Sequence, residues 1–248
     1  MIRAWIPLLC LVCSGALQAA SDYWPAAVGQ KPRIAIVIDD MGYQAERARE
    51  LVDIRTPLTL AIIPGTPEAR QVAELAQYRG FELLLHVPMQ PLIKRRSEKY
   101  LTLAMSKATL QDQLRAMLDS RPEIVGINNH EGSLLTQNSE RMSWVMEVLA
   151  RRKLFALDSR TSAKSVLAKV AGEYSVPHTQ RDVFLDDDQD PQAIAFQFRR
   201  LRRIARNHGE ALAIGHPHHA TIEMLKKEIP ALENEGFELV TCSALLQN

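Results

Sequence analysis

The chain has 248 residues, of which 30 are Lys or Arg and 29 are Asp or Glu, so its formal net charge is +1. This balance argues against a nucleic-acid-binding protein driven by a basic surface. The apolar fraction of 46% is close to the globular average and argues against disorder. The length fits one large domain or two small ones, and the three Cys exclude a disulfide scaffold.

Residues 1–20 have the layout of a secretory signal peptide. Arg3 supplies a positive charge, residues 6–12 are almost continuously apolar, and Ala19 and Ala20 offer small-residue cleavage sites. The apolar run is short for a membrane span. We therefore predict an exported protein, with the periplasm favoured, whose mature chain has no transmembrane segment. A lipoprotein modified at Cys13 and an uncleaved N-terminal anchor are the alternatives.

Residues 21–32 are predicted to be an irregular lead-in, and residues 33–248 a single domain in which short apolar runs alternate with helical patterns. Short, continuously apolar runs are typical of strands buried on both faces. The runs occupy residues 34–38, 58–63, 81–85, 124–127, 154–157, 183–185, 211–214 and 237–240. The helical patterns occupy residues 44–53, 66–80, 107–118, 139–152, 190–208 and 221–228.

This alternation predicts an α/β fold in which crossover helices connect the strands of a parallel sheet. About seven to eight mostly parallel strands in roughly 210 residues favour a distorted (β/α) barrel, closed or nearly closed. A doubly wound open sheet is the alternative.

Acids, imidazoles or amides directly follow six of the apolar runs. They stand at positions 39–40, 86, 128–130, 158, 186–188 and 216. The carboxyl ends of parallel strands meet at one edge, and sites in α/β folds are built at that edge. So many Asp, His and Asn residues in this position are hard to explain by loop solvation alone.

Asp39 and Asp40 are adjacent at a strand end, so their side chains are expected to point in different directions. One carboxylate can then bind a metal while the other faces a substrate water. His86 and His130 follow two other strands, and imidazole with carboxylate is a normal ligand set for zinc or a similar divalent ion. Such a site suits metal-assisted hydrolysis, with His216 placed to exchange protons.

Two charged segments have plainer interpretations. For residues 186–188, all Asp, a solvated loop or a helix cap is favoured over metal binding. For residues 198–203, a solvated helix face is favoured over a nucleic-acid patch because the charges spread around Phe198 and Leu201. The sequence has no Walker-type loop, no Gly-x-Gly-x-x-Gly and no Gly-x-Ser-x-Gly motif, which disfavours a serine hydrolase.

Six motifs, spread over about residues 33–246, resemble the divergent polysaccharide deacetylase family. They are IVIDDMGY at 36–43, LLHVPMQP at 84–91, GINNHEGS at 126–133, LDS at 157–159, RDVFLD at 181–186 and AIGHP at 213–217. The resemblance implies a deacetylase-like distorted barrel that uses a divalent metal. It also implies an acetylated glycan as partner, because the superfamily hydrolyses N-acetyl or O-acetyl groups on sugars.

Carried over residue by residue, the resemblance implies that Asp39 is the general base and Asp40 a metal ligand. His86 falls where the second motif of the superfamily begins, and His216 falls where a general-acid His stands. Ordinary members take two ligands from one His-x-x-x-His motif. That motif is missing after His86, so the third ligand would have to be His130.

The Arg-Pro-Pro-Tyr-type third motif of the superfamily is also missing. The oxyanion would then need another donor, either Asn129 or the backbone around His130. We therefore place Asn129 and Asp158 as candidate substrate or oxyanion residues.

Three functions remain open at this point. The first is a metal-dependent deacetylase, with zinc the favoured ion, that acts on an envelope glycan. The second is a non-catalytic carbohydrate-binding or envelope-assembly protein on a deacetylase scaffold. The third is metal-dependent hydrolysis of another bond.

Overall fold

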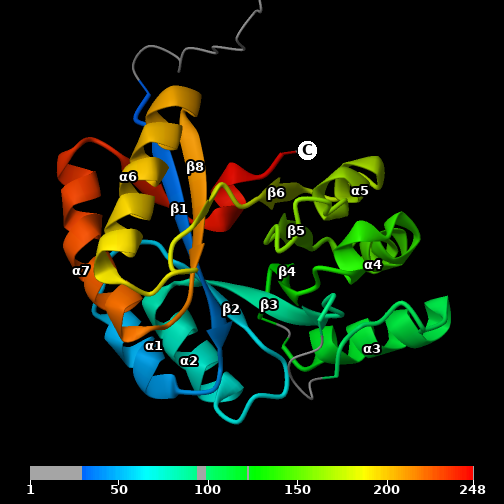
Figure 1. Ribbon diagram of the computed structural model, residues 1–248. Coiled ribbons are helices and arrows are strands. Elements are labelled where there is room, and N and C mark those ends of the chain that lie inside the picture. Colours follow the sequence, from blue (N-terminus) through cyan, green and yellow to red (C-terminus); the bar gives the residue numbers. More distant parts are fainter. Residues whose placement is uncertain (1–29, 94–98, 122, 248) are drawn as a thin grey trace, which may run out of the picture.

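The computed structural model describes residues 30–93, 99–121 and 123–247, which form a curved parallel sheet covered by helices (Figure 1). The expected signal peptide and nearly all of the expected lead-in lie outside the described residues. Among the helices that are described, none is long and apolar enough to cross a membrane.

The strands are short and alternate with helices along most of the chain. They are β1 (Arg33–Met41), β2 (Thr59–Ile62), β3 (Glu82–Met89), β4 (Gly126–Glu131), β5 (Phe155–Asp158), β6 (His178–Gln180), β7 (Val183–Phe184), β8 (Glu210–Gly215) and β9 (Glu238–Val240). The α-helices are α1 (Ala45–Val52), α2 (Ala69–Arg79), α3 (Lys107–Asp119), α4 (Ser139–Arg152), α5 (Leu167–Glu173), α6 (Pro191–His208) and α7 (His219–Asn234). Two 3₁₀ helices, η1 (Leu135–Gln137) and η2 (Cys242–Leu245), complete the list.

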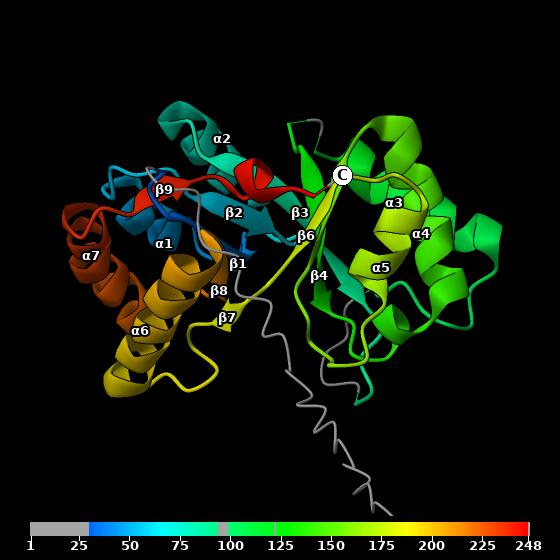
Figure 2. The ribbon, with the colours of Figure 1, turned by 90° about the horizontal axis from the view of Figure 1, so that it is seen from above.

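The sheet has the strand order β6-β5-β4-β3-β2-β1-β8-β7, and its neighbouring strands pair in parallel. Figure 2 shows the sheet curling around an open centre, with α3, α4 and α5 on one side and α1, α6 and α7 on the other. The edge strands β6 and β7 are joined by only Arg181 and Asp182 and do not pair with each other in the described chain. The predicted deacetylase-like (β/α) fold with mostly parallel strands is confirmed, and it takes the form of a half-barrel rather than a closed or nearly closed barrel.

Both faces of the central strand β1 are buried. Ile34, Ile36 and Ile38 join the large apolar cluster under the helices. Ala35 and Val37, which alternate with them, join a smaller cluster on the inner face of the sheet. This double burial is why the strands appear in the sequence as continuous apolar runs rather than as alternating patterns.

The helix predicted from residue 190 is confirmed as α6, and it begins and ends at the predicted signals, Asp190-Pro191 and Gly209. The Asp190 carboxylate accepts hydrogen bonds from the first backbone N–H groups of α6, and Gly209 ends the helix in the left-handed conformation at φ 84°. Phe198 and Leu201 are buried against the core. The basic residues around them lie outward, and Arg202 pairs with two glutamates of the α7 region at 2.6 and 3.2 Å.

Four elements differ from the sequence prediction. The helix expected from residue 66 begins at Ala69, because the backbone N–H of Glu68 donates to Gly42 and its carboxylate accepts from Ala45. Helix α7 runs past Pro230 to Asn234, where buried apolar side chains hold its last turns. Helix α5 and strand β6 were missed because they are short, and β6 reads His-Thr-Gln without an apolar run.

The strand predicted over residues 237–240 is present as β9. Strand β9 pairs with residues 33–35 of β1 and lies outside the main strand order. The edge of the main sheet beside β5 is occupied by β6.

Candidate active site

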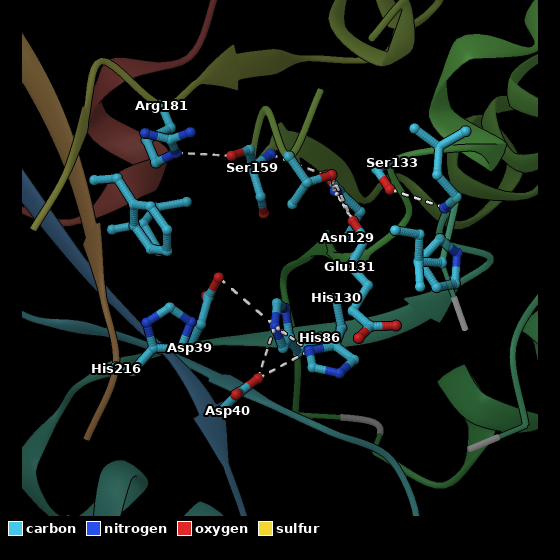
Figure 3. Close-up of a pocket in the computed structure, with 16 residues that line it drawn as sticks. Asp39, Asp40, His86, Asn129, His130, Glu131, Ser133, Ser159, Arg181 and His216 are labelled. Carbon is cyan, nitrogen blue, oxygen red and sulfur yellow. Dashed lines mark hydrogen bonds and ion pairs between the residues drawn. The ribbon is translucent and has the colours of Figure 1, made fainter. Parts of the chain in front are cut away.

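A cavity of about 600 Å³ opens at the carboxyl ends of the strands. Strands β1, β3 and β4 and the segments that follow β4, β5, β6 and β8 carry its polar side chains (Figure 3). The polar and charged residues that line it are Asp39, Asp40, His86, Asn129, His130, Glu131, Ser133, Ser159, Thr161, Arg181 and His216.

A β-bulge brings both neighbouring carboxylates to this cavity. Between Ile38 and Met41 the register of β1 against β2 shifts by one residue. Asp40 takes the left-handed conformation with φ 56°, which is uncommon for a residue other than glycine. The expectation that Asp39 and Asp40 point in different directions is therefore wrong, because a bulge interrupts the strand alternation on which it was based.

The three predicted ligands, Asp40, His86 and His130, lie together. Asp40 Oδ1 is 2.9 Å from His130 Nδ1 and 3.3 Å from His86 Nε2. The two imidazole nitrogens are 3.1 Å apart. Ligand atoms of a tetrahedral zinc ion lie about 3.3 Å from one another, because each is about 2.0–2.1 Å from the ion.

Asn128 orients the His86 ring. The amide nitrogen of Asn128 donates to Asp39 Oδ1 at 2.8 Å, so its amide oxygen is the atom that faces His86 Nδ1 at 2.7 Å. His86 Nδ1 must then carry the proton, and in the neutral ring Nε2 presents a lone pair to Asp40 and His130. Such a partner behind a ligating imidazole is typical of metal sites.

The electrostatics of this cluster also suit a cation. Burial opposes ionisation of Asp40, but the imidazoles of His130 and His86, which donate hydrogen bonds to it in their protonated forms, outweigh burial and hold the pKa of Asp40 well below the usual range. Burial likewise opposes the charged form of His86, but Asp39 and Asp40 outweigh it and raise the pKa of His86. The two carboxylates thus favour a positive charge here, and the donor set of two nitrogens and one oxygen fits zinc.

Asp39 lies next to the three ligand atoms but is not one of the ligand group. Its carboxylate is 3% exposed, and Oδ2 is 3.6 Å from His86 Nε2. Burial raises the pKa of Asp39, although His86, His216 and Asn128 act against the shift. A carboxylate with a raised pKa is a stronger base than an exposed one, which suits proton abstraction.

His216 is held by Asp186. The Asp186 carboxylate lies 2.9 Å from His216 Nδ1 and also accepts from the backbone N–H of His216 and from Thr221 Oγ1. Burial lowers the pKa of His216, but the hydrogen bond and charge of Asp186, helped by Asp39 and Asp40, outweigh it and raise the pKa to about 9. The ring is therefore protonated at neutral pH.

The solvated-loop interpretation of residues 186–188 is wrong for the first of them. Asp186 is 3% exposed and turned inward, while Asp187 and Asp188 are exposed as expected. Asp186 lies two residues after the end of β7, the neighbour of β8, and this pairing places it opposite His216.

The model of the divergent polysaccharide deacetylase family matches residues 36–246. The chain belongs to this family.

Three known proteins illustrate the relationship. The uncharacterized protein YibQ of Escherichia coli (strain K12) is 38% identical over 215 residues, which cover 86% of this chain and 67% of that protein. The uncharacterized protein ATU2773 from Agrobacterium tumefaciens C58 has a crystal structure with a TM-score of 0.81 at 23% identity, covering 89% of this chain and 92% of that chain. The catalytic domain of the peptidoglycan N-acetylglucosamine deacetylase from Eubacterium rectale ATCC 33656 has a TM-score of 0.55 at 14% identity, covering 91% and 94%. The two structural similarities show a shared fold.

The two residues predicted to contact substrate or the oxyanion, Asn129 and Asp158, form hydrogen bonds within the protein instead. Asn129 lines the cavity, but its amide accepts from the backbone N–H of Ser159 and donates to the carbonyl of Glu131 and to Thr161. Asp158 does not line the cavity, and its carboxylate accepts from the backbone of Arg160 and from Ser165. The geometry therefore favours a positioning role for both side chains over contact with an oxyanion.

Several residues in and around the site were not among the predicted ones, and four of them make informative contacts. Asn128 and Ser159 share a hydrogen bond of 3.1 Å next to Asp39. Arg181 donates to the carbonyl oxygens of Ser159 and Arg160 at 2.7 and 3.0 Å. Glu131 lines the cavity, and its Oε2 is buried without a hydrogen-bond partner among the described residues. Asn128 had a sequence signal, because it precedes His130 by two residues and so shares its face of β4.

We expect Asp186→Asn to lower the pKa of His216 from about 9 toward the ordinary value of about 6.5. The variant keeps the shape of the side chain and removes the charge that favours the imidazolium. The His216 ring would then lose its proton as the pH rises through the neutral range, whereas in the wild type it loses the proton at a pH of about 9. NMR titration of the His216 ring measures this shift. Asp188→Asn, in the same loop but exposed, is the control, and equal titration curves for both variants would contradict the pairing.

Proposed function

We propose that this protein is a metal-dependent hydrolase that removes acetyl groups from an envelope polysaccharide. The convergence of Asp40, His86 and His130 within 2.9–3.3 Å, beside a buried Asp39 and a protonated His216, carries this proposal. Membership of the divergent polysaccharide deacetylase family supports an acetylated glycan as substrate. The fold shared with a peptidoglycan N-acetylglucosamine deacetylase is consistent with it.

Asp40, His86 and His130 would hold the ion, and zinc fits their donor atoms best. When bound, a divalent ion at this position lowers the pKa of water and polarises the acetyl carbonyl. The side chains around it then divide the proton transfers between a base and an acid.

Asp39 serves as the base that takes a proton from the attacking water. Asn128 holds one Asp39 oxygen at 2.8 Å and leaves the other free to accept. His216 gives a proton to the departing amine or alkoxide. Because His216 Nδ1 faces Asp186, its Nε2 is the nitrogen available for that transfer. Water is consumed, acetate is released, and the sugar keeps its nitrogen or oxygen.

A non-catalytic glycan-binding or assembly protein is the second candidate. One observation favours it: the Asn129 amide, a candidate oxyanion donor, is fully engaged by Ser159, Glu131 and Thr161. Acetate release from peptidoglycan fragments and chitooligosaccharides by the zinc-loaded protein separates the two candidates. Release supports the hydrolase, and an inert metal-loaded protein on a broad panel of acetylated glycans supports the binding protein.

We also propose that the protein is exported, on the strength of the signal-peptide layout of residues 1–20. N-terminal sequencing of protein from its native host should give a mature chain that begins at Ala20 or Ser21. Recovery of chains that still begin at Met1 from the cytosol would contradict export.

A further inference from the structure

A second cavity, of about 740 Å³, shares Arg181 with the candidate active site. It lies where the half-barrel is open, between the linker that joins β6 to β7, the start of β8 and the helix α6. We call it the arginine pocket, after the three arginines that line it: Arg160, Arg181 and Arg200.

Among the described residues, no carboxylate forms an ion pair with an arginine of the arginine pocket. In the described part of the chain, Arg160 and Arg200 are exposed and unpaired, and the hydrogen bonds of the Arg181 side chain go to backbone carbonyl oxygens. The two acidic residues of the wall make their closest polar contacts outside the three arginines, although the charge of Arg160 also acts on the Asp182 carboxylate. Glu210 pairs with Arg33 at 2.5 Å, and the carboxylate of Asp182 accepts from the backbone N–H of Leu212 at 2.8 Å.

The loop after β5 is built to hold two of these arginines in place. The Asp158 carboxylate accepts from the backbone N–H of Arg160 at 2.8 Å, and the Asp158 carbonyl accepts from the backbone N–H of Arg181 at 3.0 Å. Arg160 takes a left-handed conformation with φ 49°, which costs energy for a residue with a side chain. This turn places Ser159 at the candidate active site and Arg160 at the arginine pocket.

The grouping of like charges is unfavourable without a ligand. Burial and then the charge of Arg160 lower the pKa of Arg181, and Arg200 acts in the same direction, whereas Asp39 and Asp158 oppose them. An anion between the guanidinium groups would relieve this repulsion. Guanidinium groups bind carboxylate and phosphate oxygens through paired, charge-assisted hydrogen bonds.

We propose that the arginine pocket is a subsite for an acidic substituent, a carboxylate or a phosphate, of the glycan whose acetyl group enters the candidate active site. The inference rests on the proposed function, because the shared residue Arg181 connects the two cavities. It narrows the substrate class to acidic glycans and disfavours neutral chitin-type polymers.

Calorimetric binding with three probes at one salt concentration tests the subsite. The probes are a neutral N-acetylglucosamine oligomer, a peptidoglycan fragment with the muramic acid carboxylate free, and a phosphorylated N-acetylglucosamine oligomer. The wild type should bind at least one acidic probe about tenfold or more tightly than the neutral one, a difference of about 1.4 kcal/mol that one charge-assisted hydrogen bond can supply. The preferred acidic probe identifies the substituent.

The double variant Arg160→Gln/Arg200→Gln should lose that preference and bind the neutral probe as before. Both side chains are exposed, so the fold should survive, and circular dichroism checks this. Arg203→Gln/Arg199→Gln on α6 is the matched control, because both residues are exposed and lie outside the pocket. Equal wild-type affinity for all three probes, no binding of any probe, or an equal loss in the control would overturn the proposal.

Binding does not require turnover, so the two proposals can fail separately. A protein that releases no acetate but still prefers acidic glycans through Arg160 and Arg200 would keep the subsite and overturn only the hydrolase. A protein that releases acetate from both neutral and acidic glycans, and that binds both with equal affinity, would support the hydrolase and overturn the subsite.

Discussion

Purified His86→Ala protein is expected to contain little bound divalent metal, with an affinity for zinc reduced by at least about 10²-fold. The substitution removes one of three converging ligand atoms, and loss of a residue that only supports a ligand already costs about 10–100-fold. It also leaves the amide oxygen of Asn128 without its donor at a fully buried position. Elemental analysis after dialysis and calorimetric zinc titration measure the change.

His130→Ala should behave in the same way, because His130 supplies the nitrogen nearest to Asp40, at 2.9 Å. His208→Ala is the control, since His208 is exposed at the end of α6, away from the three ligands. Equal metal contents in the wild type and in the His86 and His130 variants would rule out the site.

Acetate release is expected to fall by about 10²–10⁴-fold in Asp39→Asn and in His216→Ala, because each variant removes one proton-transfer group. Metal content should stay at the wild-type level, since neither side chain belongs to the ligand triad. Asp39→Asn preserves shape, so the hydrogen bonds of Asn128 and Ser159 can persist. Rates on an acetylated glycan, measured together with metal content, test both variants.

Asp187→Asn is the control for this pair, because Asp187 is exposed beside the buried Asp186. Wild-type rates in Asp39→Asn would remove the base from the mechanism. Loss of metal along with activity would instead show that Asp39 acts through the metal cluster.

The positions of the three candidate ligands were predictable from the sequence, although the ligands are far apart along the chain. Asp40 and His86 are 46 residues apart, and His86 and His130 are 44 residues apart. Continuous apolar runs identify buried parallel strands, and parallel strands bring their carboxyl ends to one edge. Residues that directly follow such runs therefore meet, whichever helices connect them. The same reasoning placed Asp39 and His216 at the cavity.

The direction of each side chain at that edge was decided by the tertiary structure. The bulge in β1 turns Asp39 and Asp40 into one cavity, and no periodicity in the sequence marks it. The prediction for Asp186 failed for a related reason. Its partner His216 is 30 residues away, and only the pairing of β7 with β8 brings them together.

By itself, the sequence determined the class of fold, the family and the edge of the sheet at which the polar residues gather. Those features depend on hydrophobic periodicity and on motifs, which are local properties of the chain. Which strand is the neighbour of which, and where the half-barrel stays open, depends on packing between distant segments. That packing assigns Asn128 to orient His86, and it places Arg181 between the candidate active site and the arginine pocket.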